Sequence, residues 1–500
     1  MILLGVALSI AVVVAIGFYV SKRVGGDSSN FLVGGRMMPY WLVGGALMGS
    51  AVDTNATLGN TDLAYGFGFW AGASLPLGLA LCLLLTGIFF AKPMNRMGLM
   101  SFPDYYRLRF GRPVEIGASL LLIVAFCMLV AGNLVAGGLL FNYFLGMPYW
   151  LGAVLIAAIA VAYTGTGGLI ADAYTAIIQM ALILVGAVGL LVWMANTHGL
   201  GSPEGMGPLA LGQLSDPAQG AVINWATLIA LGIGDIVAID FMQRVFAAKS
   251  PEAAQKACFS AAAGTALIGI PFGIAILSAA SFLPAELDGP VLFVLLDQYA
   301  PPALAVLVLC GLVGASMSTA NGAILAISNV CVRNLGGVRR TQITGKRDPL
   351  LRACRVAMAP MTVLSILIAV YVQQTGILLT LAFDLMLACL VVPFILGLVW
   401  RRGTVVAAMA AMAVGLVVRI VLFALTPTMY GVENTIFYVP NNLVSASFDG
   451  WPTFIAFAAA IVTYVAVSLA TPPATLRGLD ISVADDVDDA LGAAPVKAAI

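Results

Sequence analysis

The chain has 500 residues, of which 61% are hydrophobic and only 9% are charged, and its mean hydropathy is +1.03. This composition excludes a soluble domain, and the formal net charge of zero gives no support for nucleic-acid binding. The seven cysteines lack metal-ligand spacing and there is a single histidine, which argues against a His-based metal site and against a catalytic triad.

Apolar runs long enough to cross a bilayer predict an all-α polytopic membrane protein with 13 transmembrane helices. The predicted spans cover roughly residues 2–20, 40–66, 70–91, 114–144, 148–164, 173–195, 222–244, 258–283, 303–331, 354–373, 377–400, 403–426 and 451–471. The first run lacks a preceding basic stretch and a cleavage motif, so we expect a retained helix. Residues 472–500 are acidic and polar and are predicted to form a disordered cytoplasmic tail.

Basic residues sort to one side of the predicted spans. Every Lys and Arg except Arg419 falls within the segments 22–36, 92–112, 244–256, 333–355, 401–402 and 477–497. The loops 196–221, 284–302 and 427–450 contain none. Because cytoplasmic segments are enriched in Lys and Arg, we expect a cell-membrane protein with its N-terminus outside and its C-terminus in the cytoplasm. Segment 92–112, both basic and aromatic, is predicted to lie against anionic headgroups, with a partner-protein site as the alternative.

The second predicted span carries features that a continuous lipid-facing helix does not need. Between residues 38 and 69 it contains several glycines, among them Gly44, Gly45, Gly49 and Gly59, and the polar residues Asp53, Thr54, Asn55 and Asp62. In hydrocarbon each polar group without a hydrogen-bond partner costs roughly several kcal/mol. In transporters, broken helices place such groups where they bind ions and solutes. We therefore expect a broken helix that forms half of a substrate and ion site.

Two hydroxyl side chains share one face of the ninth span. Ala315, Ser318 and Thr319 are spaced i, i+3 and i+4. Two hydroxyls and a backbone carbonyl could supply the hard oxygen ligands of a small cation such as Na⁺. The alternative is that both hydroxyls bond back to carbonyls of their own helix.

The seventh span is the second interrupted helix, with Gly232 and Gly234 beside Asp235. Span 2 opens one five-span unit (about 40–195) and span 7 opens the next (about 222–400). An odd number of spans per unit places the two units in opposite orientations. The span count therefore predicts an inverted repeat.

Acidic residues at membrane depth are functional candidates by default. Asp53, Asp235 and Asp384 are predicted to contact the solute, together with Thr54 and Asn55. For Asp384 the alternative is an ion pair with a basic residue, and Arg419 is expected to pair with an acid or to extend toward the membrane surface. For Asp62 the alternatives are exposure to solvent and capping of a half-helix, and Asp240 is expected to pair with Arg244 at i+4.

Several stretches match the motifs of one family. They are VGGR (33–36), FPDYYRLRFG (102–111), YTGTGGLIADAYTAIIQ (163–179), QRVFAAKSPEAA (243–254) and ASMSTANGAILAISNVCVRNL (315–335). With these motifs the chain resembles the sodium:solute symporter family over its first 470 or so residues. FFAKPMNRMG (89–98), the Asp384 stretch and GLVVRI (415–420) are similar to its high-affinity choline transporter branch.

The resemblance implies a LeuT-like core (40–400) of two inverted five-helix repeats, preceded by an extra helix and linker (1–39) and followed by two helices (401–471). It also implies a sodium site made by the backbone carbonyls of Gly49 and Val52 with Ala315 and the hydroxyls of Ser318 and Thr319. Ala176 stands where many members have an aspartate linked to a second sodium, which argues against that second ion. Ala51 and Ala238 stand where the choline branch has tryptophans, which argues against choline itself.

The sequence thus predicts a sodium-coupled symporter that imports a small organic solute, such as a choline-like amine, an amino acid or a related metabolite. Its expected partners are the solute, Na⁺ and membrane lipids, and its oligomeric state is left open. The alternative is a proton-coupled carrier that uses Asp53 or Asp235 as proton acceptor. An intramembrane enzyme would need a nucleophile–base or metal constellation that the residues do not offer.

Overall fold

The computed structural model describes residues 2–284, 286–338 and 348–472. Its helices are α1 (Ile2–Ser21), α2 (Ser28–Val33), α3 (Tyr40–Ala51), α4 (Thr54–Phe67), α5 (Phe69–Leu85), α6 (Ala91–Met97), α7 (Pro103–Phe110), α8 (Arg112–Leu145), α9 (Tyr149–Thr197), α10 (Gly212–Ser215), α11 (Ala221–Ile229), α12 (Ile239–Ala247), α13 (Pro251–Ala279), α14 (Val291–Gln298), α15 (Pro302–Asn329), α16 (Pro349–Tyr371), α17 (Ile377–Met386), α18 (Val392–Val399), α19 (Val405–Leu425) and α20 (Trp451–Ala470). Two short strands, β1 (Thr428–Met429) and β2 (Val432–Glu433), pair antiparallel. The predicted tail lies outside the described residues, apart from its first residue.

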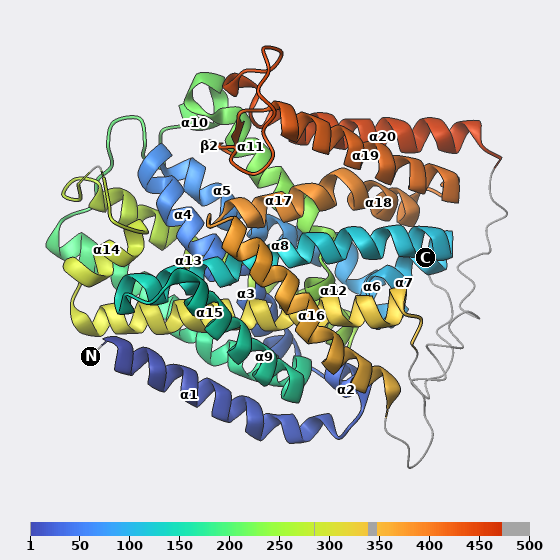
Figure 1. The fold of residues 1–500 in the computed structure, drawn as a ribbon, viewed down its shortest axis with the longest axis horizontal. Coiled ribbons are helices and arrows are strands. Elements are labelled where there is room, and N and C mark those ends of the chain that lie inside the picture. Colours follow the sequence, from blue (N-terminus) through green and yellow to red (C-terminus); the bar gives the residue numbers. More distant parts are fainter. Residues whose placement is uncertain (1, 285, 339–347, 473–500) are drawn as a thin grey trace.

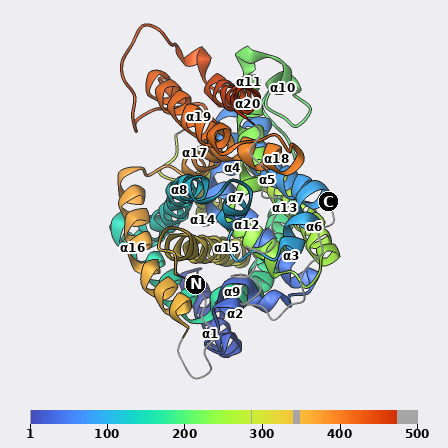
Figure 2. The same cartoon turned by 90° about the vertical axis from the view of Figure 1, so that its right-hand side faces the viewer.

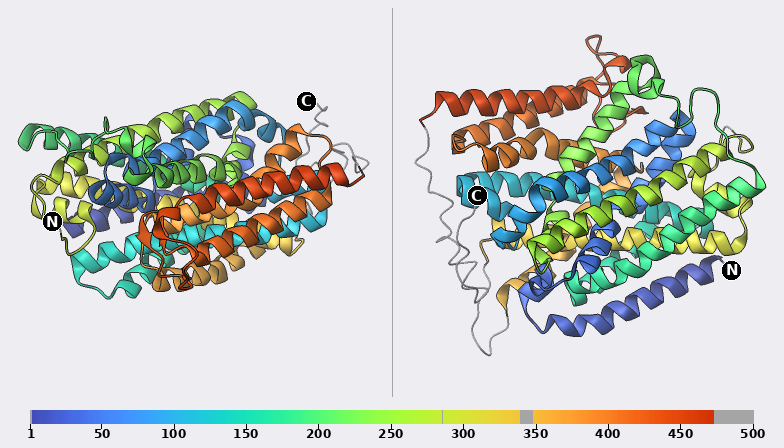
Figure 3. Two further views of the ribbon diagram at one scale, coloured as in Figure 1. Left: turned by 90° about the horizontal axis from the view of Figure 1, so that it is seen from above. Right: turned by 180° about the vertical axis from the view of Figure 1, so that it is seen from behind.

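The long helices run along the longest axis of the molecule and form one bundle (Figures 1 and 3). Viewed along the helices, α15 lies near the middle, α1 lies at one edge, and α19 and α20 lie together at the opposite edge (Figure 2). Burial agrees with this arrangement, because α15 is the most enclosed of the long apolar helices and α1 and α20 are among the least. The elements at the centre of the bundle are those in which polar residues were predicted to bind ligands.

The predicted count of 13 spans is not confirmed. Within the described residues, ten helices are long and apolar enough to cross a membrane, or eleven if the bent pair Ala221–Val237 and Ile239–Ala247 is one span. The second predicted span consists of α3 and α4, each too short to be counted alone. Spans 5 and 6 both lie within α9, whose 49 residues would extend about 70 Å as one straight helix, more than twice a bilayer core.

α9 is two helices that meet at Gly168. This glycine has φ 52° and ψ −151°, which side chains other than hydrogen avoid, and the backbone oxygen of Phe31 lies 2.4 Å from where a β-carbon would stand. The second arm packs along α15, where Ile183 lies against Gly311 and Val308 lies against Gly186. The turn at Gly168 needs glycine for two reasons, its backbone angles and its close approach to the Phe31 oxygen.

The prediction of a membrane-surface segment at 92–112 is wrong for α7. Its residues Tyr105, Tyr106 and Phe110 are buried, and the two tyrosine hydroxyls donate to the carbonyls of Phe394 (3.1 Å) and Leu390 (2.9 Å). Basic and aromatic residues occur both in segments that bind lipid headgroups and in buried segments that join helices. Composition alone therefore did not distinguish the two kinds of segment. The segment packs inside the protein against the α17–α18 helix.

Candidate functional site

The second predicted span is broken, as expected. α3 ends at Ala51, Val52 has non-helical backbone angles (φ −93°, ψ 74°), and Asp53 is the N-cap of α4. One oxygen of the buried Asp53 carboxylate accepts the backbone N–H of Ala56 (2.5 Å) and the other accepts the side-chain amide of Asn133 on α8 (2.7 Å). A carboxylate is well suited to the open N–H groups of a helix start. The break also leaves the last carbonyls of α3 without helical partners.

The hydroxyl face of α15 lies directly against this break. Ala315, Ser318 and Thr319 are fully buried, and the Thr319 hydroxyl donates to the backbone oxygen of Gly49 (3.0 Å). A β-carbon on Gly49 would stand 2.9 Å from the Ser318 hydroxyl oxygen and 3.1 Å from the β-carbon of Ala176. The close approach of α3 to α15 therefore requires glycine at this position.

Gly49, Ser318 and Thr319 are thus in contact, Ala315 lies one turn earlier on α15, and Val52 lies at the break three residues beyond Gly49. Thr54, the first residue of α4, donates its hydroxyl hydrogen to the carbonyl of Leu312, which lies on α15 one turn before Ala315. The donor set consists of hydroxyl and carbonyl oxygens, which are the ligands that hard cations take, at the end of a broken helix where transporters hold Na⁺. The residues present fit a sodium ion.

A buried ionic cluster beside these residues was only partly predicted. The expected pair of Asp240 and Arg244 is present (3.3 Å), but Arg244 also binds Asp172 on α9 (2.7 Å). Asp172 in turn accepts the Ser318 hydroxyl (3.2 Å), and Asp240 accepts the hydroxyl of Ser50. Asp172 was missed because it fell just before the predicted start of span 6, and its position in the quoted YTGTGGLIADAYTAIIQ motif was the only available signal.

The seventh span is also interrupted, slightly later than the glycines suggested. After α11 the chain forms a π-helical turn at Ala230–Gly234 and a 3₁₀ turn at Asp235–Val237, and it bends by 49° before α12. Gly234 packs against the Phe383 carbonyl, where a β-carbon would come within 2.2 Å. The glycines therefore permit close packing, and the bend follows at Ala238.

Asp235 differs from the other buried acids. It is fully buried, and neither carboxylate oxygen accepts a well-formed hydrogen bond from the described residues. The thiol of Cys82 on α5, a weak donor, lies beside it. No ion pair of the described residues includes Asp235. A carboxylate in this setting is a strong candidate for contact with a positively charged group that arrives with a ligand.

Asn55 connects the break to two further elements. Its side-chain oxygen accepts the backbone N–H of Gly376, just before α17 (2.5 Å), and its amide fills the space beside Gly132 on α8, where a β-carbon would come within 2.1 Å. The amide nitrogen has no partner among the described residues. Asp53, Thr54 and Asn55 therefore lie together at the start of α4, between α8, α15 and the turn before α17.

Comparison with known proteins agrees with this geometry. The profile of the sodium:solute symporter family matches residues 31–415, most of the chain. The chain belongs to this family. A high-affinity choline transporter of Drosophila melanogaster is 27% identical over 391 residues, covering 73% of this chain and 61% of its own length. A sodium/proline symporter of Staphylococcus aureus is 24% identical over 509 residues, covering 96% and 95%.

Solved structures show the fold of this family member. A Na⁺-coupled sialic acid symporter superposes with a TM-score of 0.76 at 18% identity, covering 94% of this chain and 98% of its own. MhsT in complex with L-phenylalanine superposes with a TM-score of 0.52 at 15% identity, covering 86% and 98%. The fold is that of LeuT-like transporters. The family and these neighbours are transporters, and the many apolar helices make the chain a multi-pass membrane protein. It spans about 60% of the length of the choline transporter that it matches.

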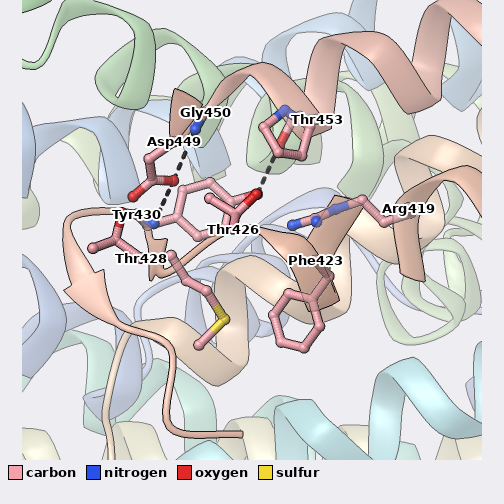
Figure 4. Close-up of a pocket in the computed structure, with 10 residues that line it drawn as sticks. Arg419, Phe423, Thr426, Thr428, Tyr430, Asp449, Gly450 and Thr453 are labelled. Atoms are coloured by element: carbon pink, nitrogen blue, oxygen red, sulfur yellow. Dashed lines mark hydrogen bonds between the residues drawn. The ribbon is translucent and has the colours of Figure 1, made fainter. Parts of the chain in front are cut away.

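Asp384, the remaining predicted solute contact, has a basic partner in this family member. Its carboxylate forms a buried ion pair with Arg419, which joins α17 to α19. Arg419 also borders a cavity of about 10 Å³ between α19 and the β1–β2 turn, where Asp449 accepts the backbone N–H groups of Tyr430 (3.0 Å) and Gly450 (2.8 Å) (Figure 4). This volume is close to the minimum for one water molecule. The hydrogen bonds of the described residues join Asp384 to Arg419 and to none of the residues at the α4 break, while its neighbour Phe383 packs on Gly234 beside Asp235.

Proposed function

We propose that the protein is a sodium-coupled symporter that imports a small organic solute by alternating access. The observation that carries the proposal is the contact of the Thr319 hydroxyl with the Gly49 carbonyl at the broken second span (3.0 Å), with Ser318 beside it. Membership of the sodium:solute symporter family supports the same function.

In this proposal the carbonyls of Gly49 and Val52 and the residues Ala315, Ser318 and Thr319 hold Na⁺. Bound sodium supplies positive charge that joins α3 to α15. The protein's own contribution is to present oxygens in place of the ion's hydration shell and to exclude water by close packing. Coupling follows from linkage, since two ligands that favour the same conformation raise each other's affinity by the same factor.

The solute is proposed to bind next to this ion, near Asp53, Thr54, Asn55 and Asp235, with Asp384 as a further candidate. The relatives are named for choline and proline, an ammonium compound and an amino acid. A carboxylate without a basic partner at Asp235 favours a solute that carries a positive charge. Both named compounds contain a positively charged nitrogen, and uptake competition between amines and neutral amino acids tests which of the two classes the protein prefers.

The test uses purified protein in liposomes. In the double variant Ser318→Ala, Thr319→Ala we expect sodium to lose its stimulation of solute uptake, while the protein still folds. Unchanged sodium dependence in this variant would rule out the site. The solute for this assay is identified beforehand by a thermal-shift screen of amines, amino acids, sugars and carboxylates, with and without Na⁺. A ligand that binds the folded protein raises the stability of that protein.

The second candidate function is proton-coupled transport with Asp235 or Asp53 as the proton acceptor. Asp235 favours it, because among the described residues this buried acid has only the weak thiol donor of Cys82 and no basic partner, so burial favours its protonated form. A pH gradient applied across liposomes in sodium-free buffer distinguishes the two. Solute accumulation under that gradient alone would support proton coupling and would contradict the sodium proposal.

A further inference from the structure

A cluster of charged side chains connects both broken spans at the centre of the bundle. Arg244 on α12 donates to Asp172 on α9 (2.7 Å) and to Asp240 on its own helix (3.3 Å), and all three side chains are at most 2% exposed. The guanidinium lies against Gly322 of α15, where a β-carbon would stand 2.3 Å from one of its nitrogens. The cluster is therefore enclosed by protein on the side of α15.

The charges of this cluster do not balance. Two carboxylates face one guanidinium, and no further Lys or Arg pairs with either carboxylate among the described residues. With both acids ionised, the cluster carries one excess negative charge in an environment of low effective dielectric constant. An enclosed excess charge of this kind attracts a cation strongly, because little solvent screens it.

The two carboxylates differ in what else they touch. Asp172 accepts the Ser318 hydroxyl at 3.2 Å, whereas Asp240 accepts the Ser50 hydroxyl and the backbone N–H of Phe241 (2.8 Å). A hydroxyl that donates its hydrogen to Asp172 keeps its oxygen lone pairs for another partner. The Ser318 oxygen is also the atom nearest to a β-carbon placed on Gly49, so it faces α3.

We infer that Asp172 is a positioning residue of the proposed sodium site: through Ser318 it orients a ligand hydroxyl toward the ion and supplies the negative charge that a carbonyl and hydroxyl shell lacks. This inference rests on the proposed function and extends it to a residue outside the ligand shell. Arg244 holds Asp172 in place. Its second partner, Asp240, accepts the hydroxyl of Ser50 on α3, so the cluster connects the proposed sodium ligands to both broken spans.

The competing explanation is that Asp172 only neutralises Arg244. The two explanations separate because Asp172→Asn and Asp240→Asn remove the same charge from the same arginine, yet only the first touches a sodium ligand. The readout is the unfolding midpoint of purified protein against NaCl concentration, with KCl keeping the ionic strength constant. We expect Asp172→Asn to raise the half-saturating Na⁺ concentration about ten-fold or more, and Asp240→Asn to raise it about three-fold or less.

Two double variants test the role of Asp172 in proteins that also lack the Arg244 guanidinium. Arg244→Gln with Asp240→Asn keeps the carboxylate of Asp172, and Arg244→Gln with Asp172→Asn keeps that of Asp240, so the two carry equal net charge. We expect only the first to retain the Na⁺ response within about three-fold of the unmodified protein. This pair gives the answer if Asp172→Asn alone does not fold.

Equal Na⁺ responses within the single pair, or within the double pair if Asp172→Asn does not fold, would overturn the assignment of Asp172 and leave the sodium site intact. A failure of the proposed function has a different signature. In that case the unmodified protein shows no stabilisation by Na⁺ over K⁺ at any concentration, and both the site and the role of Asp172 are rejected.

Discussion

Gly49 is the residue on which the contact between α3 and α15 depends. The Ser318 oxygen and the Ala176 β-carbon lie 2.9 and 3.1 Å from the position of a β-carbon at residue 49, and both belong to packed helices. An added methyl group would therefore push α3 away from the hydroxyls that are proposed to bind Na⁺. Overpacking of this kind costs about 1–3 kcal/mol.

We expect Gly49→Ala to reduce sodium-stimulated uptake about ten-fold or more, because separating the Gly49 carbonyl from Thr319 weakens the ion's shell. Uptake into liposomes at several Na⁺ concentrations measures the effect. Gly66→Ala on the neighbouring half-helix α4 is the matched control, since no atom lies within 4 Å of its β-carbon position. Equal sodium dependence in the two variants would contradict this use of Gly49.

Asp235 leads to a prediction about solute charge. If the solute carries a positive charge, Asp235→Asn removes its buried counter-charge, and we expect the KM for amines to rise about ten-fold or more. Uncharged solutes should be affected little, because they do not need the counter-charge. Parallel uptake of an amine and of an uncharged competitor checks this, and an equal rise for both would show that Asp235 serves packing or conformational change.

The hydroxyl face of α15 could be predicted from sequence, and the ionic cluster next to it could be predicted only in part. Ser318 and Thr319 lie on one helix, so their spacing alone places them together. The pair of Asp240 and Arg244 was predicted for the same reason. Asp172 is 72 residues before Arg244 in the chain, and their contact depends on how α9 packs against α12. A pattern within one helix carries no information about such packing.

At the scale of helices, the breaks were predictable and their exact positions were not. Clustered glycines and polar residues indicated both interruptions, and α4 begins at the predicted polar cluster with Asp53 as its cap. In the seventh span both glycines lie within the π-helical turn, and the bend falls after it, at Ala238. Helices tolerate single glycines when neighbouring helices pack closely on them, as α17 does on Gly234.

The ion pair of Asp384 and Arg419 joins α17 to α19, one of the two helices at the edge of the bundle. Both side chains are almost fully buried, so removing one leaves an unpaired charge in the bundle. We expect Arg419→Gln to destabilise the protein by about 3 kcal/mol, and Arg419→Gln with Asp384→Asn to regain most of that stability.

Thermal unfolding of the purified variants measures this effect, and Arg402→Gln, at an exposed arginine, is the control that should leave the midpoint unchanged. A double variant no more stable than the single one would mean that the pair is not what holds α17 to α19.

At the scale of the whole molecule, the predicted sidedness agrees with how the helix ends are distributed. In Figure 1, α2, α6 and α7, which lie in or beside the basic segments, occupy the right-hand part of the molecule. Of the segments from loops without Lys or Arg, α14 lies at the left-hand end and α10 lies at the top, left of the middle. The orientation of the two ends relative to the cell interior remains a prediction from the positive-inside rule.

Cysteine labelling in intact cells tests that orientation. Ser202→Cys and Ser447→Cys lie at exposed positions of two predicted outer loops, and Lys249→Cys lies at an exposed position of a predicted cytoplasmic segment. We expect a membrane-impermeant maleimide to label the first two in intact cells and the third only after permeabilisation. The reverse pattern would invert the topology, and labelling on both sides would show that a span was miscounted.

The turn at Gly168 has a consequence for inheritance. Every amino-acid substitution at this position adds a side chain, which would meet both a backbone conformation that favours glycine and the backbone oxygen of Phe31. Gradual adjustment by small mutational steps is therefore unavailable there. In a library that contains every substitution at position 168, selected for the transport proposed here, we expect no functional variant other than glycine.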